Sequence, residues 1–414
     1  MTSTRRTFLS TASVALSAAK AVSAPVRISS ITLSKIRGDF HKFVAMNAYD
    51  NEPKGTSYEN VLVRIVTDAG VEGVGVMGYT KPDAEFLKEI RSLLGADPEA
   101  VYKFRDGLIW GRAANFATLL TKYKHLDGPL CDLIGKLRGV PCWKLFGESV
   151  KDRVEVYDGT LYFSDLWYSD RGAQAVVDEA REAMQSGYRG IKLKIGRGSK
   201  WMQRSEGLRR DIEVIRSVRS AIGFQPRLLV DANNGYRDDF EGAWQLLSET
   251  REQRLDWLEE VFPEDAELYR RLRQRMQQAG IETPIADGEN MRAAEDFRPF
   301  VEPERLFDVM QLDIRTGGIL DCRAMSQLGE PHGAQAVPHN WGSQVGLLMS
   351  LHLAKTQKNI VAAEDDRSKC AALTVSGYEF KDGAYTVSDE PGLGLRVNED
   401  LYEAPPFPAE TVIA

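Results

Sequence analysis

The chain has 414 residues, of which 43% are hydrophobic and 27% charged, proportions typical of a globular protein with more than one domain. Its formal net charge of −7 and its pI of about 5.5 lack the basic surplus of a nucleic-acid binder, so we expect no nucleic-acid partner. The four cysteines show no spacing typical of a disulfide framework or a metal site, and beyond the N-terminal segment no apolar run could span a bilayer, so we expect free thiols and no membrane partner.

Residues 1–25 are predicted to be an export leader. The segment from Thr4 to Ser10, TRRTFLS, resembles a twin-arginine signal, and a weakly apolar stretch rich in Ala and Ser follows it, with Lys20 inside it. Twin-arginine substrates cross the membrane already folded, which predicts a periplasmic protein. The alternative is a tail with a chance arginine pair on a cytoplasmic protein.

Residues 26–150 are predicted to form an α+β domain, with strands first and helices after them. Apolar and polar residues alternate on both sides of DAG in ENVLVRIVTDAGVEGVGVMGY, which indicates a β-hairpin. In GPLCDLIGKLRGVPCWKLFG the apolar spacing is three to four, which indicates a helix ended by Gly and Pro.

Residues 151–370 change to a strict alternation of strands and helices. Eight short apolar runs are predicted as strands: VEVYD, GIKLKIG, RLLVDAN, DWLEE, PIADGE, DVMQLD, AQAVPHN and NIVAAED. Eight is the number that closes a (β/α)₈ barrel. A doubly wound open sheet usually has fewer strands, and no glycine-rich phosphate loop follows the first run. Residues 371–414 are expected to return to the first domain, and the segment DGAYTVSDEPGLGLRV within them has no helical period.

Three acidic residues end three successive predicted strands. Asp231, Glu259 and Glu289 recur every 28 to 30 residues, the period of one strand and one helix. If the strands are parallel neighbours, the carboxylates converge, and they repel each other unless a hard cation such as Mg²⁺ lies between them. In WLEE the alternation decides between Glu259 and Glu260 only if the strand is regular. Asn233 faces the same way as Asp231 and is available to a ligand or substrate.

Other predicted strands also end in polar residues that face the barrel mouth. Lys192 and Lys194 are two apart and share one face, and two close ammonium groups destabilise each other, so one can be neutral near pH 7. Asp313 and His339 end neighbouring strands, where the carboxylate would orient the imidazole. Glu364 ends the eighth strand in register with them.

The ring geometry links these groups to a reaction. In a ring of eight strands the second lies opposite the sixth, so the lysines and the Asp313–His339 pair would flank the metal from opposite sides. A substrate carboxylate on the metal would then expose its α-carbon to a base on each face. This arrangement predicts removal of a proton next to a carboxylate.

Together these motifs resemble the enolase superfamily, specifically its mandelate racemase subgroup. The barrel motifs are KLK, VDAN, WLEE, GEN, QLD, PHN and AAED, and TDAGVEGVG, DLIGKLRGVPCWKLFG and EPGLGL resemble pieces of the capping domain. The resemblance covers the chain from about Ile28 onward. It implies an α/β fold in which a (β/α)₈ TIM-like barrel carries an α+β cap that the C-terminal segment completes.

The resemblance also implies a metal site. Asp231, Glu259 and Glu289 would bind one Mg²⁺ per subunit, because the family pattern selects the first Glu of WLEE. Asn233 would assist near the metal. Val261 stands where the family usually has proline after WLEE, a change that would shift the edge of the substrate pocket.

The catalytic roles implied by the resemblance follow the same strand ends. Lys194 would be the base on one face, and Lys192 would help to hold the substrate carboxylate. His339 would be acid or base on the other face, oriented by Asp313, and Glu364 would donate a hydrogen bond to the substrate carboxylate. Only three residues separate Asp313 from the following Gly–Gly pair, one fewer than the family pattern. Either this loop is shorter or the slot of Asp313 is taken by its neighbour Leu312.

We therefore expect an enzyme that dehydrates a sugar acid to a 2-keto-3-deoxy acid. Racemisation or epimerisation of a 2-hydroxy acid uses the same two bases and is the alternative, and a periplasmic sugar-acid binder without turnover is a second one. The loops around residues 37–59 and 77–82 are expected to cover the mouth and set specificity. The expected partner is a small-molecule carboxylate, and the expected assembly is a homo-oligomer.

Overall fold

The computed structural model describes residues 25–79, 81–402 and 412–414. The predicted leader therefore lies outside the described residues, apart from Pro25. Eight parallel strands form the central barrel: β6 (Arg153–Leu161), β7 (Gly190–Lys194), β8 (Arg227–Asp231), β9 (Trp257–Glu259), β10 (Ile285–Asp287), β11 (Val309–Asp313), β12 (Gln335–His339) and β13 (Ala363–Asp365). They pair in chain order from β6 to β12, β13 pairs with β6, and a bridge between Ala336 and Ile360 connects β12 to the residues before β13. The eight strands and the barrel class predicted from the sequence are confirmed.

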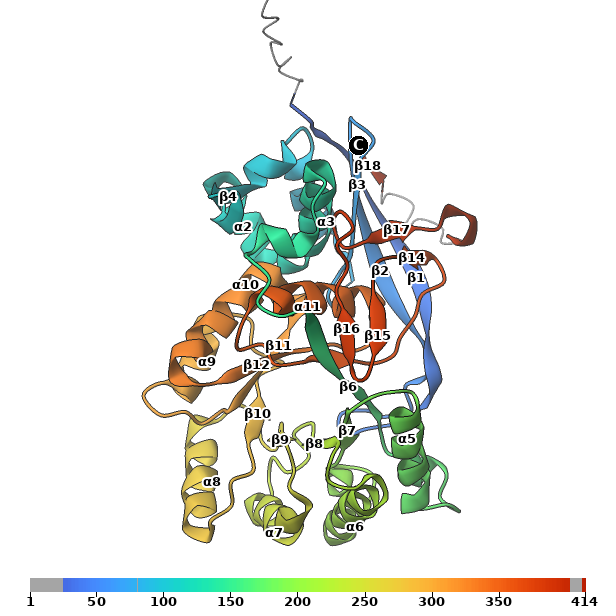
Figure 1. The fold of residues 1–414 in the computed structure, drawn as a ribbon, viewed down its shortest axis with the longest axis vertical. Coiled ribbons are helices and arrows are strands. Elements are labelled where there is room, and N and C mark those ends of the chain that lie inside the picture. Colours follow the sequence, from blue (N-terminus) through green and yellow to red (C-terminus); the bar gives the residue numbers. More distant parts are fainter. Residues whose placement is uncertain (1–24, 80, 403–411) are drawn as a thin grey trace, which may run out of the picture.

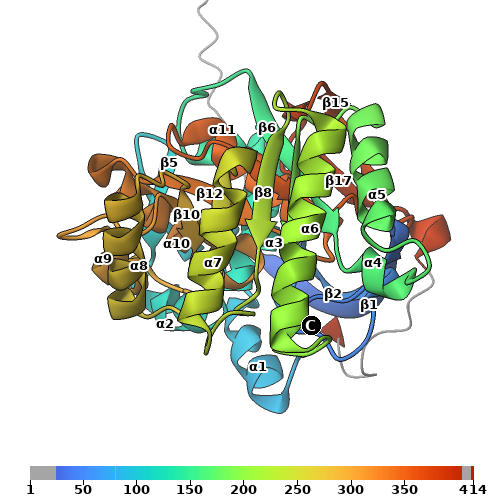
Figure 2. The ribbon, with the colours of Figure 1, turned by 90° about the horizontal axis from the view of Figure 1, so that it is seen from below.

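Seven helices follow the first seven barrel strands and cover the outside of the sheet: α5 (Ala173–Gln185), α6 (Arg204–Ile222), α7 (Phe240–Thr250), α8 (Ala266–Ala279), α9 (Ala294–Val301), α10 (Ile314–Gly329) and α11 (Gln344–Thr356). Figure 2 shows α5 to α9 arranged around the barrel. Helix α8 shows how local sequence sets these elements, because the Asp265 side chain caps its first turn and Gly280 ends it in the left-handed conformation. Between them Tyr269, Leu272 and Met276 recur every three or four residues and are buried.

The N-terminal cap lies above the barrel in Figure 1. Its sheet consists of β1 (Ile28–Val44), β2 (Gly55–Thr67), β3 (Glu72–Val76) and β18 (Val412–Ile413), and beside it lie α1 (Ala84–Glu89), α2 (Ala114–Lys122), α3 (Asp127–Arg138) and the β4 (Tyr102–Arg105) and β5 (Leu108–Arg112) hairpin. The hairpin predicted around DAG is confirmed, because β2 and β3 pair antiparallel across that turn. Gly73 allows β3 to pack on α3, since a Cβ there would overlap the carbonyl oxygen of Pro129.

The chain returns to the cap after the last barrel strand. It forms β14 (Leu373–Val375), β15 (Glu379–Lys381), β16 (Ala384–Thr386) and β17 (Leu395–Val397), and β16 pairs antiparallel with β6. The carboxylate of Asp132 on α3 accepts the backbone N–H of Leu393 at 2.7 Å and that of Val74 at 2.8 Å. In addition, β18 pairs with β1. The C-terminal segment is thus attached to the cap by backbone hydrogen bonds.

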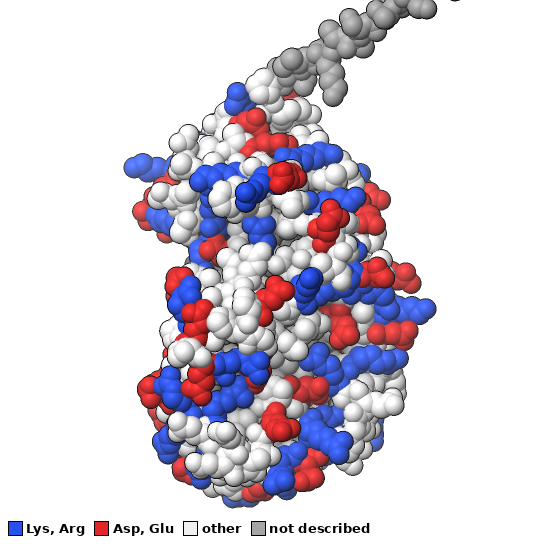
Figure 3. Space-filling view, turned by 60° about the vertical axis from the view of Figure 1, so that its left-hand side comes forward, with Lys and Arg blue, Asp and Glu red and all other residues white. Residues whose placement is uncertain are grey.

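The surface carries mixed charge. On the face shown in Figure 3, Lys and Arg side chains are interspersed with Asp and Glu, and neither sign forms a continuous patch. Among the described residues, no helix has both the length and the apolar character needed to cross a bilayer. All four cysteines are buried and unpaired, as the sequence predicted.

One buried histidine joins the barrel, the cap and the C-terminal segment. His352 on α11 is fully buried; its Nδ1 accepts the backbone N–H of Trp143 at 3.1 Å, and its Nε2 lies 2.7 Å from the Tyr378 hydroxyl. That hydroxyl donates its own proton to the carbonyl of Leu393, so Nε2 must carry the imidazole proton and the ring is neutral. Burial, helped by the positive charge of Lys355, lowers the pKa of His352 to about 3.

We expect His352 to make the fold sensitive to acid. The unfolded chain protonates this imidazole below a pKa of about 6.5, while the folded chain does so only near 3. The contribution of neutral His352 to the free energy of unfolding is therefore complete above about pH 6.5 and is lost as the pH falls toward 3. Between pH 7 and 4.5 the free energy of unfolding should fall by about 2 to 3 kcal/mol. Urea unfolding of wild type and His352→Gln at both pH values should show a smaller acid loss for the variant. Equal losses would contradict the assignment.

Candidate active site

The carboxyl ends of the barrel strands meet at one edge and are in register. Lys194 pairs across the sheet with Asp231, and Asp231 with Glu259 on the next strand. On the far side of the ring, Asp313 of β11 pairs with His339 of β12. Asp313 thus lies at the strand end in spite of the short loop that follows it, and the alternative that placed Leu312 in its slot is wrong. The predicted strand ends are thus brought together.

Three carboxylates converge at this edge, and one of them differs from the predicted set. Oxygen atoms of Asp231, Glu260 and Glu289 all lie within 4.8 Å of one another. Glu260 follows β9 directly and has a left-handed backbone (φ 46°), which turns its side chain toward the mouth. Its Oε2 accepts a hydrogen bond from Asn233 Nδ2 at 2.7 Å, and its Oε1 accepts one from Asn290 Nδ2 at 3.1 Å.

Glu259, the ligand that the sequence analysis chose, is not among the three converging carboxylates of this structure. Glu259 still belongs to regular strand β9, so it points to the same side as Trp257, into the barrel interior. There its carboxylate accepts hydrogen bonds from Lys192 Nζ at 2.9 Å, Trp257 Nε1 at 2.8 Å and Gln311 Nε2 at 3.1 Å. Burial raises its pKa to about 8, although Lys192 lowers it. Strand alternation does not separate the two candidates, because Asp231 is the partner of Glu259 across the sheet and faces the same side of the barrel.

The two lysines lie at different depths. Lys192 is fully buried, and its Nζ lies 2.9 Å from Glu259, 3.0 Å from Glu364 and 3.3 Å from Asp231. Lys194 lies nearer the mouth, forms an ion pair with Asp231 and has the Tyr162 ring 5.3 Å from its Nζ.

The carboxylates around the two lysines favour the charged form of both in this structure. Burial lowers the pKa of both ammonium groups, but the surrounding carboxylates outweigh burial and raise both values. Lys192 has three carboxylate partners that already take up its charge. It therefore links the barrel interior to the mouth, and Lys194 is the lysine closer to a substrate.

The predicted Asp313–His339 pair is not formed as a direct contact. The Asp313 carboxylate accepts the backbone N–H groups of Arg315 at 2.9 Å and Thr316 at 3.0 Å, so it caps helix α10 instead. His339 Nδ1 lies 2.8 Å from Glu364 and 3.1 Å from Glu289. Burial lowers the pKa of His339, but Glu289 and Glu364 outweigh burial and raise it to about 9.

Glu364 lies between the two basic groups. Its carboxylate contacts Lys192 and His339 and accepts the Asn340 backbone N–H at 3.3 Å. Burial alone would raise the pKa of Glu364, but Lys192 and His339 outweigh it and hold this pKa well below its usual range. In this arrangement Glu364 is ionised and accepts hydrogen bonds, in contrast to the donor role implied by the resemblance.

The chemistry of the donor set fits a divalent cation. Acidic groups at the mouth and in the layer below it outnumber the basic ones two to one: Asp231, Glu259, Glu260, Glu289, Asp313 and Glu364 against Lys192, Lys194 and His339. Within the described residues, Glu289 Oε2 is a buried atom that accepts no well-aligned hydrogen bond. Hard oxygen donors with uncompensated negative charge suit Mg²⁺.

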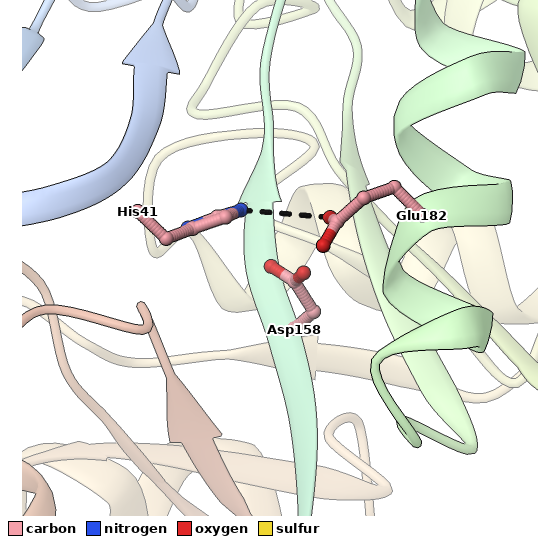
Figure 4. Close-up of side chains that lie close together, drawn as sticks. All are labelled: His41, Asp158 and Glu182. Carbon is pink, nitrogen blue, oxygen red and sulfur yellow. Dashed lines mark ion pairs between the residues drawn. The ribbon is translucent and has the colours of Figure 1, made fainter.

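A second group of possible ligands lies at the side of the barrel and is less suited to a metal. His41 of β1, Asp158 of β6 and Glu182 of α5 point toward one another in Figure 4. Arg367, however, lies 3.1 Å from Asp158 and 2.7 Å from Glu182, so a cation already neutralises both carboxylates. Burial, with Arg367 adding to it, lowers the pKa of His41 to about 4. We interpret this group as an ion-pair network between cap and barrel.

A cap loop reaches the triad, as expected for the segment that covers the mouth. The Tyr49 hydroxyl donates a hydrogen bond to Glu260 Oε1 at 2.9 Å and accepts one from Asn234 Nδ2 at 2.5 Å. Lys200, after β7, holds the loop by donating to the Tyr49 carbonyl at 2.8 Å, and Trp201 Nε1 donates to the Asn47 carbonyl at 2.7 Å. The cap thus contributes directly to the orientation of Glu260.

We expect Tyr49→Phe to weaken metal binding about tenfold, because Glu260 loses one of the hydrogen bonds that orient it. Isothermal titration of Mg²⁺ into the variant measures the change. Tyr168→Phe, an exposed tyrosine outside the site, is the matched control and should bind Mg²⁺ like the wild type. Unchanged affinity in Tyr49→Phe would mean that the cap loop does not support the ligand.

Comparison with known proteins agrees with this architecture. Residues 175–401 match the family model described as "Enolase C-terminal domain-like". The chain is 26% identical over 374 residues to D-xylonate dehydratase of Haloferax volcanii, covering 86% of this chain and 87% of that protein.

Solved structures with the same fold include two from Geobacillus. One is galacturonate dehydratase with D-galacturonate and 5-keto-4-deoxy-D-galacturonate, at 27% identity and a TM-score of 0.78, covering 92% of this chain and 96% of the other. The other is a mandelate racemase/muconate lactonizing protein complexed with magnesium/tartrate, at 27% identity and a TM-score of 0.78, covering 91% and 94%. The chain belongs to the enolase C-terminal domain-like family, with its barrel and its N-terminal cap both present.

Proposed function

We propose that the protein is a Mg²⁺-dependent dehydratase of a sugar acid, with one Mg²⁺ per subunit. The observation that carries the proposal is the carboxylate triad between two basic groups, with Lys194 against Asp231 on one side and His339 against Glu289 on the other. Relatives named as dehydratases of xylonate and galacturonate support the same reaction.

Asp231, Glu260 and Glu289 would hold the metal, with Asn233 and Asn290 fixing the orientation of Glu260. When bound, Mg²⁺ draws negative charge onto the substrate carboxylate and makes the α-proton more acidic. The chain supplies the rest of the site. Asp231 and Glu260 are fully buried and Glu289 is partly buried, which strengthens their electrostatic interactions.

The proton transfers are assigned to two residues. A cation held by Asp231 would offset the charge that raises the pKa of Lys194, so that Lys194 can act as the neutral amine. This amine removes the α-proton, and the ammonium that results remains beside Asp231. As the β-carbon–oxygen bond breaks, the imidazolium of His339 gives a proton to the departing hydroxyl group, which leaves as water. The enol that remains takes up a proton at the β-carbon to give a 2-keto-3-deoxy acid. Each transfer uses a group at a defined side of the triad.

Racemisation or epimerisation of a 2-hydroxy acid is the second candidate. The observation that favours it is the same one, since bases on both sides of the triad can remove a proton from one face and return it to the other. Elimination differs only in needing a leaving group at the β-carbon. The substrate therefore decides between the two reactions.

A library of sugar acids and 2-hydroxy acids, incubated with the Mg²⁺-loaded protein in ²H₂O, tests the proposal. Formation of 2-keto-3-deoxy acids, detected with semicarbazide, is the expected result. Incorporation of deuterium at C2 without formation of a ketone would show that the reaction is racemisation and not dehydration. Ligand binding without either product, in wild type and in Lys194→Met alike, would identify a binding protein.

We also propose that residues 1–25 direct the folded protein to the periplasm. The support is the TRRTFLS segment. Replacing Arg5 and Arg6 by lysine should leave the protein in the cytoplasmic fraction. Unchanged periplasmic recovery, or a wild type confined to the cytoplasm, would reject export by this route.

A further inference from the structure

A cavity of about 270 Å³ lies between the cap and the barrel loops. Its cap side comes from β1, β2 and the segment after β3, and its barrel side from the residues that follow β11 and β12. The side chains that matter for its chemistry are Lys35, Asn60, Tyr79, Lys81, Arg315 and Trp341. Three of these are cations, and the one carboxylate in its wall, Glu59, is ion-paired with Lys35 at 2.5 Å.

Arg315 is the feature of this cavity that lacks an explanation. Its side chain is 3% exposed, and within the described residues no carboxylate lies within 4.0 Å of it. Nη1 donates to the Trp341 carbonyl at 2.6 Å and Nη2 to the Met77 carbonyl at 3.4 Å, while Nε is buried without a partner. Burial of a guanidinium is costly unless an anion compensates its charge.

The position of Arg315 connects the cavity to the proposed reaction. Arg315 follows Asp313 by two residues, and Trp341 follows His339 by two residues, so both extend the two strands on the His339 side of the site. Tyr79, whose ring lies 4.5 Å from the Arg315 guanidinium, covers the same side from the cap. A substrate held at the triad by one end would therefore extend toward this cavity with its other end.

We propose that Arg315 receives a second carboxylate at the far end of the substrate, so that the substrate is a dicarboxylic sugar acid. This inference rests on the proposed function and narrows its substrate class. The planar guanidinium fork matches a carboxylate better than a neutral hydroxymethyl group, and Lys81 adds positive charge around it, since Lys35 is paired with Glu59. Tartrate, the ligand of a related solved structure, is itself a dicarboxylate.

Steady-state kinetics of matched pairs test this subsite. Galactarate and glucarate carry a carboxylate where galactonate and gluconate carry a hydroxymethyl group. We expect kcat/KM to be at least about 100-fold higher for the diacids, the range expected of a charge-assisted pair in a buried site. In Arg315→Gln the ratio of diacid to monoacid should fall toward one, mainly through a higher KM for the diacid, and Arg315→Lys should restore part of it.

Binding measurements separate this inference from the proposed function. Calorimetric titration of galactarate and galactonate into Mg²⁺-loaded Lys194→Met, with and without Arg315→Gln, reports the preference without turnover. Thermal unfolding of Arg315→Gln shows whether this variant is still folded. Lys81→Gln changes an exposed residue, which should not disturb the fold, and it should lower the preference for the diacid severalfold. Equal affinity and turnover for monoacids, or a preference for a 6-phosphoaldonate over the diacid, would overturn the subsite and leave dehydration standing. If the protein binds the diacid more tightly but dehydrates no acid, the subsite is upheld and the proposed dehydratase function is overturned.

Discussion

Lys194→Met is expected to reduce turnover by about 10³- to 10⁴-fold, the usual contribution of a positioned general base. The variant keeps the length of the side chain and removes only the amine that would take the α-proton. Because Lys194 forms an ion pair with Asp231, its loss frees that carboxylate, so Mg²⁺ affinity should stay the same or rise. Keto-acid assay, exchange of the α-proton in ²H₂O and Mg²⁺ titration measure the three quantities.

A surface lysine supplies the control for this variant. Lys122 pairs with Glu85 and Glu89 on the cap, away from the strand ends, and Lys122→Met should keep full activity. If Lys194→Met retains more than a tenth of the wild-type turnover, the base must be another group. A large loss of Mg²⁺ affinity would instead show that the lysine supports the metal site.

Glu260→Gln is expected to raise the Mg²⁺ dissociation constant by at least about 100-fold, more than a substitution next to a ligand usually causes. The amide keeps the shape and removes a charged oxygen from the triad with Asp231 and Glu289. Glu259→Gln should change Mg²⁺ affinity by less than about tenfold, because Lys192, Trp257 and Gln311 already occupy the Glu259 carboxylate. Titration of Mg²⁺ into both variants decides between two adjacent glutamates.

The stability of the two variants should rank in the opposite order. Glu259 accepts a hydrogen bond from the buried ammonium of Lys192, so Glu259→Gln is expected to lower the free energy of unfolding by about 2 to 3 kcal/mol, within the range for hydrogen bonds to charged groups. Urea unfolding without Mg²⁺ measures this difference. A strong loss of Mg²⁺ affinity in Glu259→Gln with none in Glu260→Gln would restore the original assignment.

The adjacent glutamates show where sequence reasoning stopped. The apolar run DWLEE predicted a strand ending in acid, and β9 confirmed it. The choice between its two acids depended on one backbone dihedral, the left-handed φ of Glu260, which is stabilised by contacts with Asn233, Asn290 and Tyr49. Tyr49 is more than 200 residues away in the sequence, and no local pattern predicts such a contact.

The hydrogen-bond partners of His339 could not be predicted from the sequence either. Register placed Asp313 opposite His339 as predicted, but a carboxylate at the start of a helix also has the backbone N–H groups of that helix as donors. Asp313 accepts hydrogen bonds from those N–H groups, and His339 contacts Glu289 and Glu364 instead. Which of two available hydrogen bonds forms depends on side-chain rotamers and on neighbours from other strands.

The amino-acid sequence by itself determined the eight-strand alternation, the hairpin of the cap and the set of strand ends that carry chemistry. These features follow from periodicity and from residues near one another in the chain, because strands and helices bury their apolar faces at fixed spacings. Only the tertiary structure decided that Glu260 lies beside Asp231 and Glu289, that carboxylates surround both lysines, and that Arg315 is buried beside the mouth. Those outcomes depend on burial and on charges brought together from distant segments, since the free energy of a buried charge is set by its surroundings in space.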